Sequence, residues 1–237
     1  MKRVIIIGAS SGIGRGLAEH YLREGCRVGL VGRREHLLRE VADCDPERCR
    51  YAVADISRPH SAAALEHLAA TLGGMDLCVA AAGTGELNPA LDFDLEASAI
   101  LTNVLGWTAA VDWAYAFFER QGGGHLAVIT SLGGLRGSGA APAYNASKAY
   151  QINYTEGLRQ RAARARLALT ITDLRPGLVA TAMAKGEGLF WVMPLDRVVR
   201  QIVRALHRRR RVAVVTRRWR IAGWLLRHLP TWIYLKM

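Results

Sequence analysis

A serine, a tyrosine and a lysine in the middle of the chain have the spacing of a proton-transfer site. Tyr144 and Lys148 are four residues apart, so on a helix they share one face. Ser131 stands thirteen residues before Tyr144, at the end of a predicted strand. A phenol with a pKa of about 10 is a poor acid–base group near neutrality, and an ammonium beside it would favour the phenolate. A ketone that accepts a hydride needs a proton, so the trio predicts carbonyl–alcohol chemistry, with Ser131 donating a hydrogen bond to the carbonyl oxygen.

A second candidate site is a glycine-rich turn near the start of the chain. The spacing is G-x-x-x-G-x-G, between a predicted strand and a predicted helix. The first glycine permits the tight turn, the second lets the backbone approach a pyrophosphate, and the third allows close packing of helix on strand. The free N–H groups of the helix N-terminus favour phosphate. The predicted phosphate-binding residues are Gly8, Ser10, Ser11, Gly12, Ile13 and Gly14.

These residues need a scaffold, and the hydrophobic pattern predicts one. Short β-branched runs alternate with longer amphipathic or alanine-rich stretches, which predicts an α/β fold with a parallel sheet covered on both faces. Right-handed crossovers make this a doubly wound, seven-stranded Rossmann fold in a single domain. The predicted strands are residues 4–7, 27–31, 50–53, 76–80, 125–130, 168–173 and 212–215. The predicted helices are residues 12–24, 34–42, 59–72, 95–120, 142–166 and 195–207.

The end of the second predicted strand bears on the choice of cofactor. An acid there would accept hydrogen bonds from an adenosine ribose and indicate NAD. The chain has Gly32 instead, followed by Arg33 and Arg34, which can pair with a 2′-phosphate. The pattern favours NADP(H) over NAD(H).

The glycine loop taken together with Ser131, Tyr144 and Lys148 resembles the short-chain dehydrogenase/reductase family over residues 3–215. The resemblance implies that Lys148 also holds the nicotinamide ribose and that Asn103 positions a proton-relay water. It implies a homodimer or homotetramer built on the helices at 95–120 and 142–166. The further cofactor-binding residues that it implies are Asp55 and Ile56 at the adenine, Ala82 and Gly83 after the fourth strand, and Pro176, Gly177, Val179 and Thr181 at the carboxamide.

Two positions depart from the family pattern. Ile7 stands where a threonine often precedes the first glycine, and Ala80-Ala81-Ala82-Gly83 replaces Asn-Asn-Ala-Gly. The second change removes side chains that brace the central sheet. The family's substrate lid corresponds to residues 184–194, where Phe190 and Trp191 suggest an apolar substrate wall or ordinary packing.

The net charge of +12 is confined to the end of the chain. Residues 1–196 are neutral overall, whereas residues 197–237 carry 12 Lys and Arg and no acid. We therefore expect an oxidoreductase domain at 1–215 and a basic amphipathic extension at 216–237. On a helical wheel, Trp219, Ala222, Leu225, Leu226 and Leu229 oppose the arginines, with Trp224 among the cations.

Such a helix, with basic and aromatic flanks, is typical of a membrane interface, and the arginines at 208–211 would add attraction to anionic lipid. Arg220, Arg227 and Pro230 prevent it from spanning a bilayer. Other interpretations stay open: packing against the chain's own sheet or a sister subunit, an acidic carrier protein or nucleotide-bearing thioester, and, least favoured, nucleic acid.

The remaining composition is unremarkable for an enzyme of a reducing cytoplasm. The four cysteines form no CxxC pair or metal-ligand spacing, and the N-terminus predicts no signal peptide. We expect a cytoplasmic NADP(H)-dependent reductase of an apolar or lipid-like ketone, associated with the inner face of the membrane if the extension binds lipid. The alternatives are a 3-oxoacyl-thioester reductase and a non-catalytic cofactor-binding regulatory protein.

Overall fold

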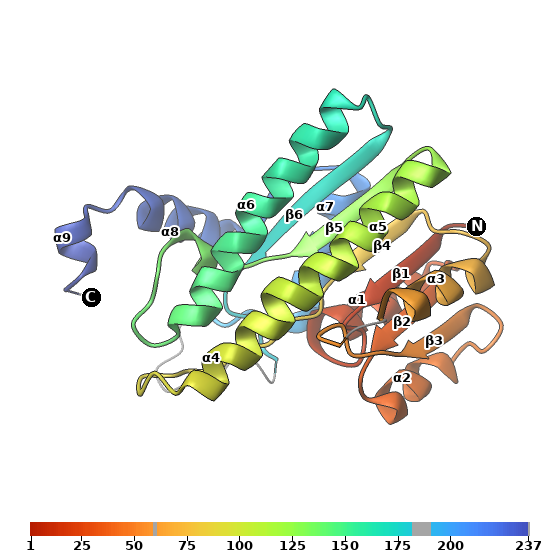
Figure 1. Ribbon diagram of the computed structural model, residues 1–237, viewed down its shortest axis with the longest axis horizontal. Helices are drawn as coiled ribbons and strands as arrows, with labels where there is room; N and C mark the ends of the chain where they lie inside the picture. Colours follow the sequence, from red (N-terminus) through yellow and green to blue (C-terminus); the bar gives the residue numbers. More distant parts are fainter. Residues whose placement is uncertain (59–60, 182–190, 237) are drawn as a thin grey trace.

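The computed structural model describes residues 1–58, 61–181 and 191–236. Its centre is a parallel sheet of seven strands in the order β3-β2-β1-β4-β5-β6-β7, which confirms the predicted fold class (Figure 1). All seven predicted strands are present, with small differences at their ends. The strands are β1 (Arg3–Ile7), β2 (Arg27–Gly32), β3 (Cys49–Val53), β4 (Leu77–Ala80), β5 (Gly124–Ile129), β6 (Leu169–Pro176) and β7 (Val212–Val215).

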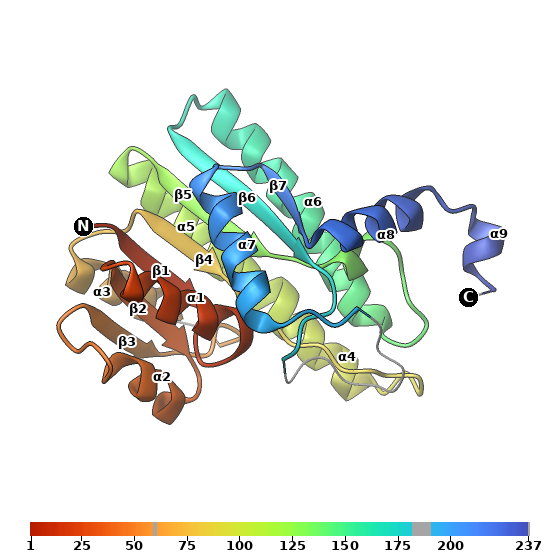
Figure 2. The same cartoon turned by 180° about the vertical axis from the view of Figure 1, so that it is seen from behind.

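Helices cover both faces of this sheet. One face carries α1 (Gly12–Arg23), α2 (Glu35–Ala42) and α7 (Leu195–His207), and the other carries α3 (Ser61–Leu72), α5 (Trp107–Gln121) and α6 (Pro142–Arg164) (Figures 1 and 2). Strand β1 shows why the strands read as continuous hydrophobic runs: Val4 and Ile6 belong to the first core, while Ile5 and Ile7 belong to the second.

The predicted helix at 95–120 is interrupted. It consists of α4 (Phe93–Ile100), a π-helical turn (Leu101–Gly106) and α5. The hydrophobic period does not reveal the π-helical turn, because the three helical pieces are consecutive and continuous along the chain. The cause is tertiary: a Cβ on Gly106 would lie 2.5 Å from the carbonyl oxygen of Ile56, so only a glycine lets the helical stretch pass this close to the turn after β3.

The strand order reverses between β1 and β4, and this is where the glycine loop lies. Gly8 has φ +93°, and a Cβ there would lie 2.5 Å from the amide nitrogen of Ala82. A Cβ on Gly14 would lie 2.1 Å from the carbonyl oxygen of Gly8. The turns after β1 and β4 therefore touch backbone to backbone at the switch point, where open α/β sheets bind ligands.

The end of the chain leaves the body. Helix α8 (Arg217–His228) follows β7, and the short α9 (Thr231–Tyr234) lies beyond it, projecting from the molecule in Figures 1 and 2. Within the described ranges, no helix is long and apolar enough to cross a membrane.

We expect Gly14→Ala to lower the free energy of unfolding by about 1–3 kcal/mol, because the added methyl overlaps the Gly8 carbonyl. Thermal unfolding measures the loss. Gly157→Ala is the matched control, since Gly157 is exposed on α6 with no atom within 4 Å of the added Cβ, so this variant should be as stable as wild type or more so. If Gly14→Ala were as stable as wild type, the close approach of Gly14 to the Gly8 carbonyl would be contradicted.

Candidate active site

The predicted site residues lie around one cavity of about 770 Å³ at the carboxyl edge of the sheet. The cavity runs from the glycine loop and the end of β2 to Ser131, Tyr144 and Lys148. Of the residues predicted from the sequence, all line it except Asn103. The sequence therefore selected residues that the fold brings together, although they come from seven separate segments of the chain.

At one end of the cavity, the N-terminus of α1 is open to an anion. Ser11 occupies the N-cap position, yet its side chain does not cap the helix, and the first turn of α1 contains no acid. The Ser11 hydroxyl accepts a hydrogen bond of 2.7 Å from Arg34 instead. Gly12 has φ +55°, a backbone conformation that favours glycine. Uncapped N–H groups and the helix dipole suit a phosphate here.

Two arginines follow β2 at the same end. Arg34 Nη2 donates to Ser10 Oγ at 2.9 Å as well as to Ser11, so its guanidinium lies over the glycine loop. Arg33 is exposed, with Nη1 3.8 Å from Asp55 Oδ2. Burial opposes ionisation of Asp55, but hydrogen bonds from Ser57 and the charge of Arg33 leave the pKa of that carboxyl below its usual value. Ile56, beside it, is buried.

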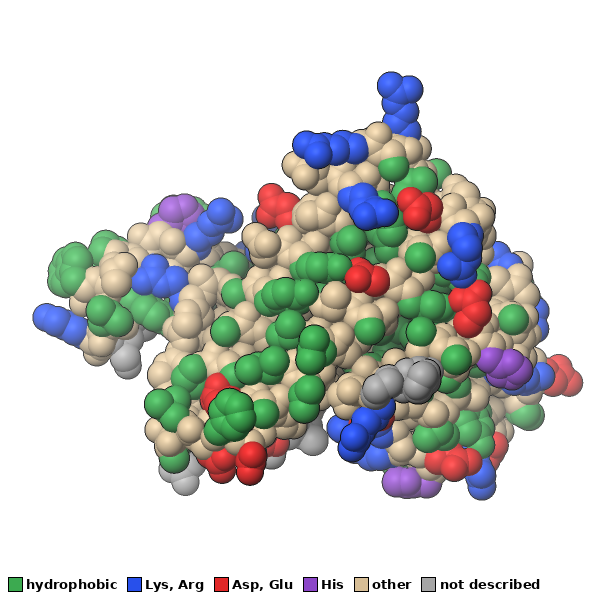
Figure 3. Space-filling view, in the orientation of Figure 1, with side chains coloured by type: hydrophobic (Ala, Val, Ile, Leu, Met, Phe, Trp, Pro, Cys, Tyr) green, Lys and Arg blue, Asp and Glu red, His purple; other side chains and the backbone are tan. Residues whose placement is uncertain are grey.

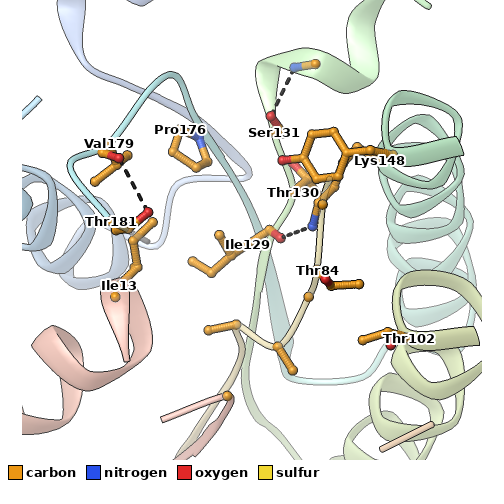
Figure 4. A pocket seen from close by; sticks show the side chains of 18 of the residues that line it. Ile13, Thr84, Thr102, Ile129, Thr130, Ser131, Lys148, Pro176, Val179 and Thr181 are labelled. Carbon is orange, nitrogen blue, oxygen red and sulfur yellow. Dashed lines mark hydrogen bonds between the residues drawn. The ribbon is translucent and has the colours of Figure 1, made fainter. Parts of the chain in front are cut away.

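The other end of the cavity holds the three candidate catalytic residues, of which Figure 4 labels Ser131 and Lys148. Ser131 follows β5, and its Oγ accepts a 3.0 Å hydrogen bond from Gly133 N. Tyr144 lies in the first turn of α6, and Gly85 faces its ring so closely that a Cβ there would lie 2.6 Å from a ring carbon. Lys148, one turn further along α6, is buried with its Nζ 5.9 Å from the Tyr144 ring centroid.

The expected effect of Lys148 on the pKa of Tyr144 stays a prediction, because in this structure the ammonium makes its hydrogen bonds elsewhere. The ammonium points to the carbonyl oxygen of Ile129 at 3.2 Å and to Gln151 Oε1 at 2.9 Å (Figure 4 shows the first of these bonds). Burial raises the pKa of Tyr144 above its usual value, and a hydrogen bond with Ser131 opposes the rise. Burial also lowers the pKa of Lys148 to about 8, against the attraction of Asp173.

Asn103 lies behind the cavity, in the π-helical turn, and is fully buried. Its side chain brackets Thr84: Oδ1 accepts from Thr84 N at 2.9 Å, and Nδ2 donates to Thr84 O at 2.7 Å. Nδ2 also donates to Ser147 Oγ at 3.0 Å. The geometry makes Asn103 a brace for the segment after β4, and its relay water stays a prediction.

Gln151 is the member of this network that the sequence interpretation missed. It is fully buried, accepts from Lys148, and donates from Nε2 to the carbonyl oxygen of Asn103 at 2.9 Å. The sequence contains a signal for Gln151: it stands three residues after Lys148 and seven after Tyr144, on the same face of α6.

The segment after β6 closes the cavity on the side of α1. The Thr181 hydroxyl donates to the Val179 carbonyl at 3.4 Å, and a Cβ on Gly12 would lie 3.3 Å from the Thr181 methyl (Figure 4). Pro176 and Gly177 also line the cavity. Of the lid predicted at 184–194, residues 184–190, including Phe190, lie outside the described residues. Trp191 is 44% exposed and does not line the cavity.

The sequence interpretation also missed the part that the end of the chain plays in this cavity. Trp219, Leu226 and Tyr234 line it, together with Arg136 from the loop after β5. Residues of the predicted extension therefore form part of the site. Among the described residues, no cluster of His, Cys, Asp and Glu could hold a metal ion.

A dinucleotide fits the residues present. The cavity joins an uncapped helix N-terminus with two arginines at one end to a buried ammonium at the other, and all three loop glycines line it. Phosphates suit the first end, and ribose hydroxyls would accept hydrogen bonds from Lys148 at the second.

Known proteins show the same architecture. A short-chain dehydrogenase/reductase of Burkholderia phymatum in complex with NAD superposes with a TM-score of 0.85 at 20% identity, covering 94% of this chain and 92% of that one. A 3-ketoacyl-(acyl-carrier-protein) reductase of Brucella melitensis complexed with NADH gives a TM-score of 0.81 at 22% identity, covering 90% and 96%. At these identities the likeness is one of fold.

Sequence comparison goes further. An uncharacterized oxidoreductase of Myxococcus xanthus is 34% identical over 168 residues, which span 67% of this chain and 65% of the relative. The model of the short chain dehydrogenase family matches residues 2–189, which include the glycine loop, Ser131, Tyr144 and Lys148. The chain therefore belongs to the short-chain dehydrogenase/reductase family, as its motifs predicted.

Proposed function

We propose that this protein is an NADP(H)-dependent oxidoreductase that interconverts a ketone and a secondary alcohol on an apolar substrate. The observation that carries the proposal is the meeting of Ser131, Tyr144 and Lys148 in the same cavity as the glycine loop. A protein that only binds a nucleotide has no use for a phenol, a hydroxyl and a buried ammonium beyond the phosphate end.

Each side chain has a distinct task in this proposal. The nicotinamide, when bound, supplies or accepts the hydride. Ser131 donates a hydrogen bond to the substrate oxygen and holds it beside Tyr144. Tyr144 is the proton donor of the reduction, since a phenol is protonated at neutral pH. Lys148 binds the ribose, and its charge favours the phenolate left after proton transfer. Asn103 is a positioning residue that holds Thr84.

The preference for NADP(H) rests on the arginines at the phosphate end. Arg34 lies over Ser10 and Ser11, Arg33 lies beside it, and Gly32 offers no carboxylate to a ribose 2′-hydroxyl. Guanidinium groups at this end of the cavity suit a 2′-phosphate. Neighbours of similar fold hold NADH, NAD or NADP+, so they support a nicotinamide nucleotide while the preference depends on these side chains.

The apolar substrate is inferred from the wall beyond Tyr144. Leu87, Leu132, Trp219 and Leu226 line that part of the cavity, with Ala140 and Ala141. Aliphatic and aromatic walls with a few placed polar groups are typical of sites for apolar small molecules. A panel of ketones of increasing chain length, with NADPH oxidation as the readout, tests this. Reduction of a 3-oxoacyl thioester and of none of the simple ketones would overturn the apolar-ketone assignment.

Replacing Tyr144 with phenylalanine should reduce kcat for ketone reduction by about 10²–10⁴-fold, because the proton donor is removed. Binding of NADPH, followed by its fluorescence, should stay within about twofold of wild type, since the ring that packs on Gly85 remains. Turnover at the wild-type rate would exclude Tyr144 as the acid.

Arg34→Ala should raise KM for NADPH by about 10–100-fold, the range for one charge-assisted contact, and leave KM for NADH unchanged. Arg39→Ala is the control, because Arg39 is exposed on α2, outside the cavity, and pairs with Glu35. If KM for both cofactors rose equally in the Arg34 variant, the residue would serve the loop and not the 2′-phosphate.

Lys148→Met should make the protein inactive, and its effect on stability should depend on pH. Wild type holds Lys148 at a pKa of about 8, against about 10.5 when unfolded, so the folded state loses this proton first as pH rises. The cost of burying the charge is therefore full below pH 8 and declines above it. The stability of wild type should rise relative to the variant by about 2 kcal/mol between pH 7 and 9.5, measured by urea unfolding. If the difference in unfolding free energy between wild type and the variant did not change with pH, burial would not be lowering the pKa of Lys148.

A further inference from the structure

Residues 216–236, here called the C-terminal segment, form one wall of the cavity. Trp219 packs on Gly177 so closely that a Cβ there would lie 2.3 Å from the indole ring. A Cβ on Gly223 would lie 2.8 Å from Leu132, in the turn after Ser131. The inner side of α8 is therefore seated on the two loops that carry site residues.

Arg136 attaches the same segment further along. Its Nη1 donates to the carbonyl oxygen of Leu229 at 3.1 Å, and its guanidinium lies 4.4 Å from the Tyr234 ring centroid. The Tyr234 hydroxyl in turn donates to the carbonyl oxygen of Gly137. These contacts fix α8 and α9 relative to the loop after β5, so the position of the segment is tied to the position of the site.

This seating corrects the helical-wheel expectation in part. Trp219 is buried and Leu226 faces the cavity, so much of the predicted apolar face is used by the body of the protein itself. Leu225, placed on the same face by the wheel, is 53% exposed. What the segment offers to a partner is its outer side.

The outer side combines large apolar side chains with cations (Figure 3 shows both kinds on the projecting segment). Trp224 is 64% exposed and Trp232 67%. The exposed apolar residues are Ile221, Trp224, Leu225, Trp232 and Leu235. The exposed cations are Arg218, Arg220, Arg227 and Lys236, and the chain has no acid after Asp196.

The arginines at 208–211 do not extend this surface. They lie between α7 and β7, at the start of β7, whereas α8 begins after its end. The loop is held at that edge of the sheet, since Thr172 donates to the carbonyl oxygen of Arg210 and Arg209 donates to Thr170. In the sequence the cations form one tail. In the fold, the arginines at 208–211 lie at the amino end of β7 and those of α8 follow its carboxyl end.

Exposed tryptophans among arginines, on a short helix that does not span a bilayer, match the side chains favoured at the boundary of lipid headgroups and acyl chains. The positive charge without acids is complementary to anionic lipid. An acidic protein or a nucleic acid would use the arginines but leave Ile221, Leu225 and Leu235 in water.

We propose that the outer side of the C-terminal segment binds an anionic membrane surface, and that its inner side thereby presents the cavity to amphiphilic carbonyl substrates held in lipid. The presentation of the cavity to lipid-held substrates rests on the proposed function, whereas membrane binding does not. The two sides are connected, because Trp219, Leu226 and Tyr234 line the cavity while Trp224, Leu225 and Trp232 lie on the same short helices and face away.

Co-sedimentation of the full-length protein with vesicles tests the first clause. We expect binding to vesicles of phosphatidylglycerol and phosphatidylcholine, weaker binding at 0.5 M salt, and little binding to phosphatidylcholine alone. Arg220→Ala with Arg227→Ala should weaken binding about 30-fold, the effect of two surface cations. Trp224→Ser with Trp232→Ser, which leaves the charge intact, should weaken it about tenfold.

The matched control removes the same charge from the opposite edge of the sheet. Arg208→Ala with Arg210→Ala should change vesicle binding less than threefold. Equal losses in the two arginine pairs would overturn the proposal, since attraction would then follow net charge alone. Failure of wild type to bind anionic vesicles would overturn it too. In that case, a lower solution mass of the tryptophan variant by light scattering would assign the surface to contacts between copies.

A long-chain ketone carried in the same vesicles tests the second clause. Its reduction by NADPH should be at least tenfold faster with the wild-type segment than with the tryptophan variant, while reduction of a short water-soluble ketone should be equal. Equal rates on the vesicle substrate would overturn the link to the site. Absence of reduction of any ketone would refute the proposed function, and sedimentation would still decide membrane binding independently.

Discussion

Burial of one ammonium organises the candidate site. Lys148 is only 4% exposed, so its charge must be met by hydrogen-bond acceptors, and in this structure these are the Ile129 carbonyl and Gln151. Gln151 also donates a hydrogen bond to the carbonyl oxygen of Asn103. The Asn103 side chain in turn hydrogen-bonds both the N–H and the carbonyl of Thr84. Strand β5, helix α6, the π-helical turn and the segment after β4 are thereby held together around the cavity.

This network coincides with the break in the long helix. The Asn103 carbonyl accepts from Gln151 in the stretch where the helix widens to a π turn, and Gly106 brings the same stretch against the turn after β3. A regular α-helix through 95–120 would satisfy the local hydrophobic period equally well. The π turn is a tertiary solution, and such turns are frequent at functional sites.

The end of the chain shows how a segment can belong to a site without carrying a motif. Trp219 and Gly177 fit each other because a glycine leaves room for an indole ring, and Arg136 adds a hydrogen bond and a cation–π contact. Residues 1–196 are neutral overall and the end of the chain is cationic, yet the two are in contact. Part of the end packs into the body, and part remains available for a surface.

The sequence alone determined the sheet, its seven strands, the glycine loop and the three candidate catalytic residues, because each depends on local chemistry: the period of apolar residues, the backbone freedom of Gly8 at φ +93°, and the spacing of Tyr144 and Lys148 along one helix. It did not show where the ammonium points, since a spacing of four residues does not fix the hydrogen-bond partners of a lysine. Only the tertiary structure decided that Lys148 turns to Ile129 and Gln151, that Asn103 braces Thr84, and that Trp219, Leu226 and Tyr234 wall the cavity. Apart from the Lys148–Gln151 pair, these contacts join residues far apart in the chain, and their energy comes from burial and hydrogen-bond satisfaction that no local pattern contains.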